Sequence, residues 1–418
     1  MWWQQPGLLE SYLEDFLSDA LHRRGLAELL LDGNTRPEDL LPNPRHFGFS
    51  SLDMVELARC FALALGLDRT GISDLLLARR SAEGWLGVAR RSLEIDASRF
   101  VFHTSGTTQS PKPVTHETWR LQREIDCLAT LLSKPARMLS LVPLHHIYGF
   151  IWGIVLPAHW QIPMLRVKPE RTLPDHWAAQ FRDGDMIIAT PDIWSLVARL
   201  EVKLPPRFIG ISSTAPLSPE VAARLRLDYP DATLMEVFGS TETAAIGWRT
   251  KDGDTFNLLP YWQLTTDGER ARLVDIDTGD ARLLDDGMRI VNATRFEPLG
   301  RQDQVIQIAG HNVSLTAVTR LLCTYPGMAD ALVRPADTPM GLRLKLYCVL
   351  EQAPASATTW YEHFSQWLDV NLGHLPPPIS IVIGDSRPEN VMNKAVDWPD
   401  STGKPVFGCL RSEFAQSH

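Results

Sequence analysis

Apolar residues recur at helical spacing near the start of the chain. Leucines and aromatic residues at positions 8–21 lie three or four apart, which predicts an amphipathic helix. A second helix is predicted over residues 51–65, where Ser50 or Ser51 can cap the first turn. We therefore expect residues 1–93 to form a helical segment.

The pattern changes near residue 100, where short apolar runs begin to alternate with helical stretches. The runs with strand character are Met138–Val142, Met186–Ala189, Phe208–Ile211 and Thr233–Val237. Strands separated by helices usually pair in parallel, so this alternation predicts an α/β body with mainly parallel sheets over residues 94–300. Shorter strands and helices over residues 301–418 predict a small α+β C-terminal domain.

Composition and charge exclude several classes of protein. With 418 residues, the chain can bury a large core in two or three domains. Its formal net charge of −9 argues against a nucleic-acid partner, which requires a basic face. No run approaches about 18 uninterrupted apolar residues, so membrane insertion is not expected. The start of the chain lacks signal-peptide features and the five cysteines are scattered, which indicates a cytoplasmic protein.

A loop rich in hydroxyl groups follows the apolar run at residues 100–102. It reads T-S-G-T-T-Q-S-P-K over residues 104–112, and the backbone N–H groups and hydroxyls of such a loop can surround a polyphosphate. The order of residues differs from G-x-x-x-x-G-K-[ST], so this is not the P-loop of the usual NTPases. The candidate phosphate-binding residues are Thr104, Ser105, Gly106, Thr107, Thr108 and Lys112.

This loop resembles the phosphate loop of the AMP-forming adenylating enzymes, a family that includes acyl- and aryl-CoA synthetases and luciferases. The segment P-L-H-H-I-Y-G at residues 143–149 resembles the family's P-L-x-H-x-x-G. The resemblance implies that His146 is a catalytic residue beside the carboxylate substrate and the thiol entrance, with Trp152 lining the acyl pocket. The alternatives are a histidine satisfied by hydrogen bonds and a tryptophan of the core. His145 and His146 are expected to point to opposite faces, as neighbours on a strand do, which disfavours a shared metal.

Two further segments resemble nucleotide-binding motifs of the same family. Ser212–Leu217 resembles S-G-G-A-P-L, and Phe238–Glu242 matches [YF]-G-x-T-E. The resemblance implies that adenine lies against both segments, that Gly239 also borders the acyl pocket, and that Thr241 and Glu242 hold the Mg²⁺ of ATP. A glutamate suits that role because its carboxylate is a hard oxygen ligand. The expected adenine-binding residues are Thr214, Ala215, Pro216, Phe238 and Gly239.

A third segment that resembles a nucleotide-binding motif of the family lies at the start of the expected C-terminal domain. Gly300–Asp303 reads G-R-Q-D and resembles the family's G-R-x-D. The resemblance implies that Arg301 binds the ribose and that Asp303 is the hinge about which the small, mobile C-terminal domain rotates. Relatives also hold the ribose with an aspartate that precedes this arginine, which implies Asp286, with Asp280 as the rival position.

The chain also departs from the family's pattern at several positions. The catalytic lysine of relatives lies in P-R-x-x-x-G-K, which implies Lys394 in P-E-N-V-M-N-K, with Lys404 in T-G-K as the alternative. Asn393 replaces a glycine of that motif, and Gln109 replaces a glycine of the phosphate loop. Residues 213–214 replace both glycines of the S-G-G-A-P-L motif. Because glycine alone adopts positive φ without strain, Gln109 and Asn393 leave room for slow or altered catalysis.

The helical N-terminal segment carries a resemblance of its own. Residues 48–57 read G-F-S-S-L-D-M-V-E-L and resemble the G-x-D-S-L-x-x-V-E-L of acyl carrier proteins, although Ser50 replaces the aspartate. The resemblance implies Ser51 as a phosphopantetheine attachment site. The alternative is that Ser51 caps a helix that covers the adenylation core.

Together these resemblances imply one reaction. A carboxylic acid, in particular an aryl acid such as a hydroxybenzoate, attacks ATP·Mg²⁺ and forms an acyl-adenylate, and a pantetheine thiol of CoA or of an acyl carrier protein then takes the acyl group. The implied cofactors are ATP and Mg²⁺, with CoA or phosphopantetheine for the second step. The alternative is a catalytically impaired relative that binds nucleotide or a carrier protein as a scaffold, for which Gln109 and Asn393 are the argument.

Overall fold

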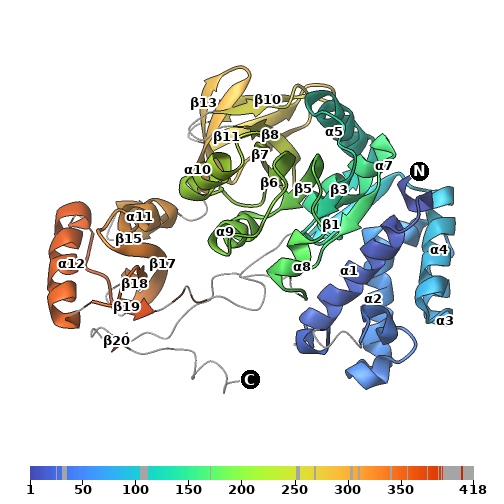
Figure 1. Cartoon of the computed structure of the whole chain (residues 1–418), viewed down its shortest axis with the longest axis horizontal. Helices are drawn as coiled ribbons and strands as arrows, with labels where there is room; N and C mark the ends of the chain where they lie inside the picture. Colours follow the sequence, from blue (N-terminus) through green and yellow to red (C-terminus); the bar gives the residue numbers. More distant parts are fainter. Residues whose placement is uncertain are drawn as a thin grey trace. The chain divides into compact units, whose positions relative to one another are not determined.

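The chain forms two compact units in the computed structural model (Figure 1). The first contains residues 1–263 and 291–296, and the second contains residues 264–290 and 297–418. The expected domain boundaries at residues 93 and 300 stay a prediction. The structure describes residues 1–24, 26–30, 35–103, 112–169, 171–250, 255–267, 270–301, 305–308, 311–338, 341–354, 356–373, 375–384, 386, 388 and 406–407.

Helices begin the first unit, as the periodicity predicts. They are α1 (Leu8–His22), α2 (Ser51–Ala64), α3 (Leu75–Ala78) and α4 (Ala82–Ile95), with short 3₁₀ turns at Trp2–Gln4, Ala27–Leu30, Pro37–Leu40, Pro44–Phe47 and Leu67–Arg69. Ser50 is the cap of α2, because its Oγ accepts a hydrogen bond from the Asp53 N–H at 3.2 Å. Gly66, with a φ of 70°, follows the end of the helix.

Aromatic side chains join these helices to the rest of the first unit. The ring centroid of Tyr12 on α1 lies 6.4 Å from that of Phe61 on α2, which lies 5.0 Å from that of Trp85 on α4. Tyr12 also lies 6.1 Å from Phe150, which in turn lies 4.9 Å from Phe100. All five side chains are buried, and Figure 1 shows α1, α2 and α4 packed together in blue. The helical segment therefore shares one hydrophobic core with the strands that follow it.

A β-hairpin leads from the helices into the body of the unit. β1 (Arg99–His103) contains the predicted apolar run, and it pairs antiparallel with β2 (Pro113–Glu117). His103 and Pro113 are the last pair of the register before the loop. α5 (Thr118–Leu131) follows directly. The hairpin thus holds both ends of the candidate phosphate loop.

Among the described residues, the main sheet has nine strands in the order β13, β14, β9, β8, β7, β6, β5, β3, β4. Their bounds are β3 (Met138–Ser140), β4 (Met164–Arg166), β5 (Asp185–Ala189), β6 (Phe208–Ser212), β7 (Thr233–Ser240), β8 (Ala244–Arg249), β9 (Phe256–Leu258), β13 (Asp286–Asn292) and β14 (Arg295–Arg301). β4, β3, β5, β6 and β7 pair in parallel, and β8 and β9 continue antiparallel. The predicted α/β body with a mainly parallel sheet is confirmed.

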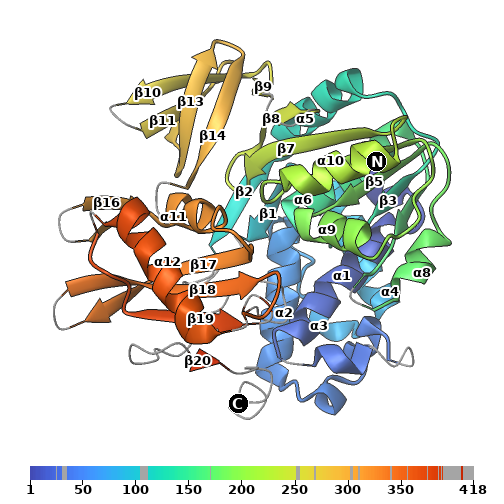
Figure 2. The same cartoon turned by 60° about the vertical axis from the view of Figure 1, so that its left-hand side comes forward.

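Helices cover this sheet where the chain crosses from strand to strand. α6 (Ile147–Phe150), a π-helical turn (Ile151–Val155) and α7 (Leu156–Trp160) follow β3, and α8 (Pro174–Ala178), α9 (Pro191–Arg199) and α10 (Pro219–Asp228) come later. Trp194 of α9 and Leu225 of α10 belong to one buried cluster with Ile187 of β5 and Leu234 of β7. Figure 2 shows α9 and α10 over the sheet. The proline that begins α10 follows the cap Ser218, whose Oγ accepts a hydrogen bond from the Val221 N–H.

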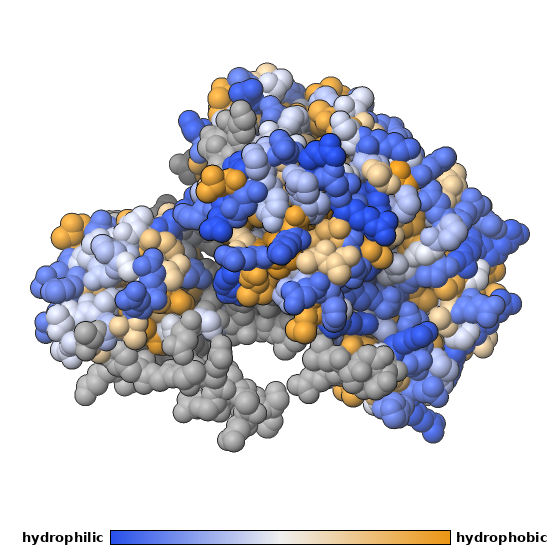
Figure 3. Space-filling model, viewed as in Figure 1, coloured by the Kyte–Doolittle hydropathy of each residue, from blue (hydrophilic) through white to orange (hydrophobic). Residues whose placement is uncertain are grey.

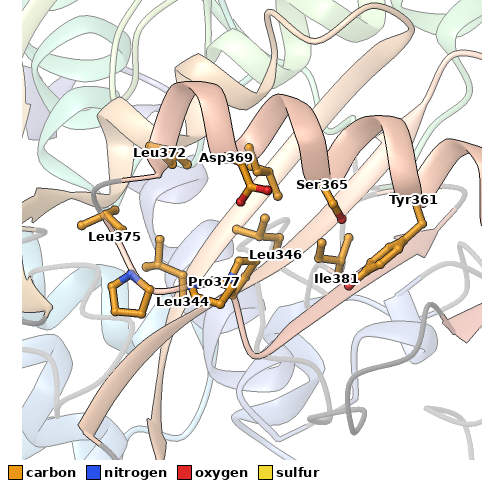
Figure 4. A pocket seen from close by; sticks show the side chains of 12 residues that line it. Leu344, Leu346, Tyr361, Ser365, Asp369, Leu372, Leu375, Pro377 and Ile381 are labelled. Atoms are coloured by element: carbon orange, nitrogen blue, oxygen red, sulfur yellow. The ribbon is translucent and has the colours of Figure 1, made fainter.

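The second unit contains an α+β fold, as predicted. Its elements are β10 (Trp262–Asp267), β11 (Arg270–Asp275), β12 (Ala281–Leu283), β15 (Val305–Ile308), β16 (His311–Ser314), α11 (Leu315–Leu322), β17 (Met328–Thr338), β18 (Gly341–Leu350), α12 (Ala357–Leu372), β19 (Ser380–Gly384) and β20 (Val406–Phe407). α12 lies across β17, β18 and β19 (Figure 2), and Phe364 and Leu368 bury its inner face. A small pocket of about 80 Å³ remains beside α12, lined mainly by leucines and prolines and also by Tyr361, Ser365 and Asp369 (Figure 4).

The surface is mixed in character. Figure 3 shows hydrophilic residues over much of the visible face, with apolar residues in smaller areas between them. Within the described ranges, no helix has both the length and the apolar character that a membrane crossing requires.

Candidate active site

The carboxyl ends of three parallel strands lead into the segments that the sequence motifs single out. β3 leads to the two histidines, β6 leads to Ser213 and Thr214, and β7 leads to Thr241 and Glu242. The carboxyl ends of parallel strands meet at one edge of a sheet, which is where ligands of open α/β sheets bind. The fold of the first unit therefore brings these segments to a common edge.

The turn after β6 has a strained backbone. Thr214 adopts a φ of 86°, a conformation that a β-branched residue rarely takes and at a position where the family motif has glycine. Ser213 Oγ donates a hydrogen bond to the Val237 carbonyl at 2.8 Å. The Leu217 N–H donates to Glu236 Oε2 at 3.2 Å. These contacts fix the expected adenine turn against β7.

Glu236 is a residue of this site that the motifs do not include. It is buried on β7, and its Oε1 lies 2.8 Å from a guanidinium nitrogen of Arg249 on β8. The carboxylate thus links the turn after β6 to the antiparallel strand β8. In the sequence, Glu236 is marked only as a charged residue inside an apolar strand. Such a residue is usually paired with a buried group of opposite charge or with a hydrogen-bond donor.

The turn after β7 is closely packed and rich in oxygen atoms. A Cβ on Gly239 would lie 2.1 Å from the Ala244 carbonyl oxygen, so only glycine fits there. The Ser240 N–H donates to Thr243 Oγ1 at 3.1 Å, and the Glu242 side chain is exposed. Phe238 packs against Phe256 of β9 and Phe296 of β14, with ring centroids 5.7 Å away in both cases.

A histidine on β2 ties the phosphate-loop hairpin to this turn. His116 Nε2 lies 2.7 Å from the Thr241 carbonyl oxygen, to which it donates a hydrogen bond, and His116 is buried. Lys112 is exposed and directly precedes β2. The expected phosphate ligands Thr104–Thr108, together with Gln109, lie outside the described residues. The strand that follows them, β2, is nevertheless joined by His116 to the backbone of Thr241, one of the two expected magnesium ligands.

Glu124 on α5 is a second buried carboxyl group that the motifs do not include. Its Oε2 accepts a hydrogen bond from the Ala245 N–H at 3.1 Å, and its Oε1 has no hydrogen-bond partner among the described residues. Burial raises the pKa of Glu124 to about 7. Ala244, with a φ of 58°, and Ala245 begin β8 directly after the turn. Glu124 therefore supports the backbone on which Thr241 and Glu242 depend.

The expectation that the two histidines point to opposite faces is wrong. β3 ends at Ser140, so His145 and His146 lie in the following loop rather than on a strand. Their ring centroids are 4.1 Å apart with an angle of 44° between the planes. His145 is largely buried, whereas His146 is exposed and precedes α6. Gly149 is required because a Cβ there would lie 2.0 Å from the Pro143 carbonyl oxygen.

The surroundings of the other candidate residues in the first unit do not test their expected roles, which stay predictions. Trp152 lies in the π-helical turn and is only 1% exposed. Such burial fits a residue of the core as well as a residue that lines an acyl pocket. Ser51 is exposed as the first residue of α2, so its modification stays a prediction. Ala215 and Pro216 are exposed in the turn after β6.

The remaining candidates belong to the second unit. Asp286 is the first residue of β13, and Arg301 is the last residue of β14. Asp280 lies just before β12, and its backbone carbonyl accepts a hydrogen bond from the Asp275 N–H. The roles of these residues in binding ribose stay predictions. Asp303, Asn393, Lys394 and Lys404 lie outside the described residues.

Comparison with known proteins gives consistent results. The model of the family described as AMP-binding enzyme matches residues 58–283. A protein of Cereibacter sphaeroides named 4-coumarate–CoA ligase is 33% identical over 89% of this chain and 89% of its own length. One of the same name from Halorhodospira halophila is 31% identical over 82% of this chain and 86% of its own length.

Solved structures share the fold. O-succinylbenzoate coenzyme A synthetase from Bacillus subtilis, in complex with ATP and magnesium ion, aligns over 75% of both chains with a TM-score of 0.56 and 16% identity. The motif segments, the architecture of the first unit and the identity with curated relatives agree. The chain therefore belongs to the family of AMP-binding enzymes and is an AMP-forming acid–thiol ligase.

Proposed function

We propose that the protein activates an aryl acid of the hydroxycinnamate or hydroxybenzoate type with ATP and transfers the acyl group to the thiol of coenzyme A. The main support is the meeting of three motif segments at one sheet edge, in a chain 33% identical to a protein named 4-coumarate–CoA ligase over 89% of both lengths. The carrier-protein thiol is the alternative acceptor, and an aqueous cytoplasmic location is part of the proposal.

The residues at the sheet edge suit a magnesium nucleotide. The turn after β7 offers the Glu242 carboxylate and the Thr241 hydroxyl, and oxygen atoms are the ligands that Mg²⁺ prefers. ATP·Mg²⁺ supplies the electrophilic α-phosphorus when bound. Thr241 and Glu242 would hold the metal ion, residues 104–108 and Lys112 the phosphates, and the backbone at residues 214–216 with Phe238 and Gly239 the adenine.

Orientation of the acid would come from the loop between β3 and α6. His146 is exposed at that loop and can donate a hydrogen bond to a carboxylate. Trp152 and Gly239 remain the proposed walls of the acyl pocket. From the second unit, Lys394 would stabilise charge at the α-phosphate, and Arg301 with Asp286 would bind the ribose, with Asp303 as the proposed hinge. Catalysis of this kind consists mainly of positioning and charge stabilisation.

ATP–pyrophosphate exchange with a panel of acids tests this function. The panel contains 4-coumarate, other hydroxycinnamates, hydroxybenzoates and medium-chain fatty acids, and each active acid is then offered CoA. We expect exchange and thioester formation with one or more of the aryl acids. Glu242→Gln should lower the exchange rate by about 100-fold, because it removes a charged metal ligand. Glu201→Gln, which changes a side chain that is 80% exposed, is the matched control.

The same panel separates the alternatives. Exchange with fatty acids alone would contradict the aryl assignment, and no exchange with any acid would favour a nucleotide-binding scaffold. Exchange without thioester formation from CoA would favour a carrier protein as acceptor. In that case, the intact mass after treatment with a phosphopantetheinyl transferase tests Ser51, with Ser51→Ala as the control.

A further inference from the structure

Helix α1 carries two acidic side chains toward the loop that contains the histidines of the site. Asp15 and Asp19 lie four residues apart and therefore share one face of the helix. Their side chains are 2% and 14% exposed. None of the sequence motifs includes this helix, and the proposed reaction does not otherwise use it.

Asp15 fixes the backbone immediately before the histidines. Its Oδ2 accepts hydrogen bonds from the Leu144 N–H at 2.8 Å and from Arg166 Nε at 2.8 Å. Burial by itself would raise the pKa of Asp15, but the Arg166 guanidinium and the Leu144 N–H hold it below its usual value. The residue is therefore a carboxylate at neutral pH, and it anchors the loop from β3 to the body of α1.

Asp19 faces the ring of His145. Asp19 Oδ2 lies 3.7 Å from His145 Nε2 and also pairs with Arg23 of the same helix. The His145 side chain is 9% exposed, and within the described ranges neither of its ring nitrogens has a hydrogen-bond partner. The ring of His145 in turn packs against the exposed ring of His146, at 4.1 Å between centroids.

We propose that Asp19 is a positioning residue for the acid site: it holds the ring of His145, which packs against the ring of His146 and fixes its direction. The inference rests on the proposed role of His146 beside the carboxylate substrate. It makes α1 a support of the active site in addition to a cover of the core. Asp19 acts through His145 and touches no substrate.

The charged and titratable groups around His145 come from several elements. They are Asp15, Asp19 and Arg23 of α1, Arg166 of β4, His103 at the end of β1, and the neighbouring His146. Burial lowers the pKa of His145, although the carboxylates of Asp19 and Asp15 act in the opposite direction. His145 is therefore neutral at pH 7, and charge changes at Asp19 and Arg23 should move its titration in opposite directions.

Histidine NMR titration of the full chain tests the contact directly. Imidazole carbons are labelled, and His145→Gln and His146→Gln assign the two signals. Asp19→Asn should lower the pKa of His145 because it removes a carboxylate beside a cationic ring. Arg23→Gln should raise it because it removes a positive charge. Arg23 is 56% exposed, so Arg23→Gln reports on the charges around His145 without replacing a buried residue.

Two further variants separate positioning from helix stability. Glu10→Gln changes a carboxylate on the same helix that pairs with Arg90 instead, and it should leave both histidine signals unchanged. Asp19→Glu keeps the charge and should restore the titration of His145. If Asp19→Asn and Arg23→Gln both leave the His145 titration unchanged, as Glu10→Gln does, the inference is overturned whatever the activity.

Kinetics give the second measurement. In Asp19→Asn, kcat/KM for the acid should fall by about 10-fold to 100-fold, the range that misplacement of an orienting group produces, while the KM for ATP stays unchanged. Asp19→Glu should recover most of the loss. Equal losses for the acid and for ATP would indicate general damage and would contradict the proposal. If the unaltered protein activates no acid, the proposed function fails, and the NMR titration alone decides on the Asp19 contact.

Discussion

Backbone conformation at single residues explains part of the motif pattern in this chain. Gly239 and Gly149 are required by sterics, because a Cβ at either position would meet a carbonyl oxygen at 2.1 Å or 2.0 Å. Thr214 is the opposite case, because it occupies a glycine position of the family motif and still adopts a φ of 86°. A non-glycine residue in such a conformation stores roughly 1–3 kcal/mol of strain.

Thr214→Gly should therefore stabilise the protein. Relief of the strain outweighs the greater flexibility that glycine gives the unfolded chain, about 0.5–1 kcal/mol, so we expect the free energy of unfolding to rise by about 1 kcal/mol. Urea unfolding measures the change. Thr190→Gly is the control, because Thr190 caps α9 with a φ of −84° and its replacement should give no gain. A Thr214→Gly protein that is less stable than the unaltered one would contradict the strain argument.

Hydrogen bonds between elements hold the turn after β7, which we propose as the magnesium site, in place. His116 of β2 binds the Thr241 carbonyl, and Glu124 of α5 binds the Ala245 N–H on the other side of the turn. The indole of Trp262 donates to the Ala245 carbonyl at 2.8 Å. The hairpin and α5 thus position a turn that is distant in sequence.

Glu124→Gln should change how stability depends on pH. Burial raises the pKa of Glu124 from 4.5 to about 7, so its contribution to stability is complete below pH 4.5 and is lost as the pH rises through 7. The difference corresponds to roughly 3 kcal/mol at alkaline pH. Glutamine cannot ionise, so we expect the variant to be the more stable protein at pH 8, with the advantage shrinking toward pH 5.

Urea unfolding at several pH values measures this effect. Glu201→Gln is the control, because it makes the same chemical change at a side chain that is 80% exposed and should give no gain in stability at pH 8. Equal slopes for Glu124→Gln and the unaltered protein across this range would show that Glu124 does not titrate there.

The two compact units divide the expected active-site residues between them. The first unit contains the hairpin and the turns after β3, β6 and β7, and the second contains Asp286, Arg301 and both candidate lysines. The complete reaction we propose requires residues of both units. Replacing a residue of the second unit therefore tests whether that unit takes part in the reaction that we propose.

Lys394→Ala should abolish most of the ATP–pyrophosphate exchange, by about 100-fold or more, because it removes the charge that we assign to the α-phosphate. Lys404→Ala should leave exchange within about 3-fold of the unaltered protein, since we assign the phosphate contact to Lys394 and a charge beyond contact distance is largely screened. Exchange with the best acid of the panel measures both. The opposite result would identify Lys404 as the catalytic lysine.

The sequence by itself determined the elements and the chemistry, because both depend on local patterns. Periodicity predicted α1, α2 and the parallel strands, and short motifs predicted the nucleotide-binding segments. The tertiary structure decided the supports of the site, since Asp19, His116 and Glu124 act on residues more than a hundred positions away. It also reversed the arrangement of His145 and His146, because β3 ends before them and a loop, unlike a strand, does not force neighbouring side chains to opposite faces.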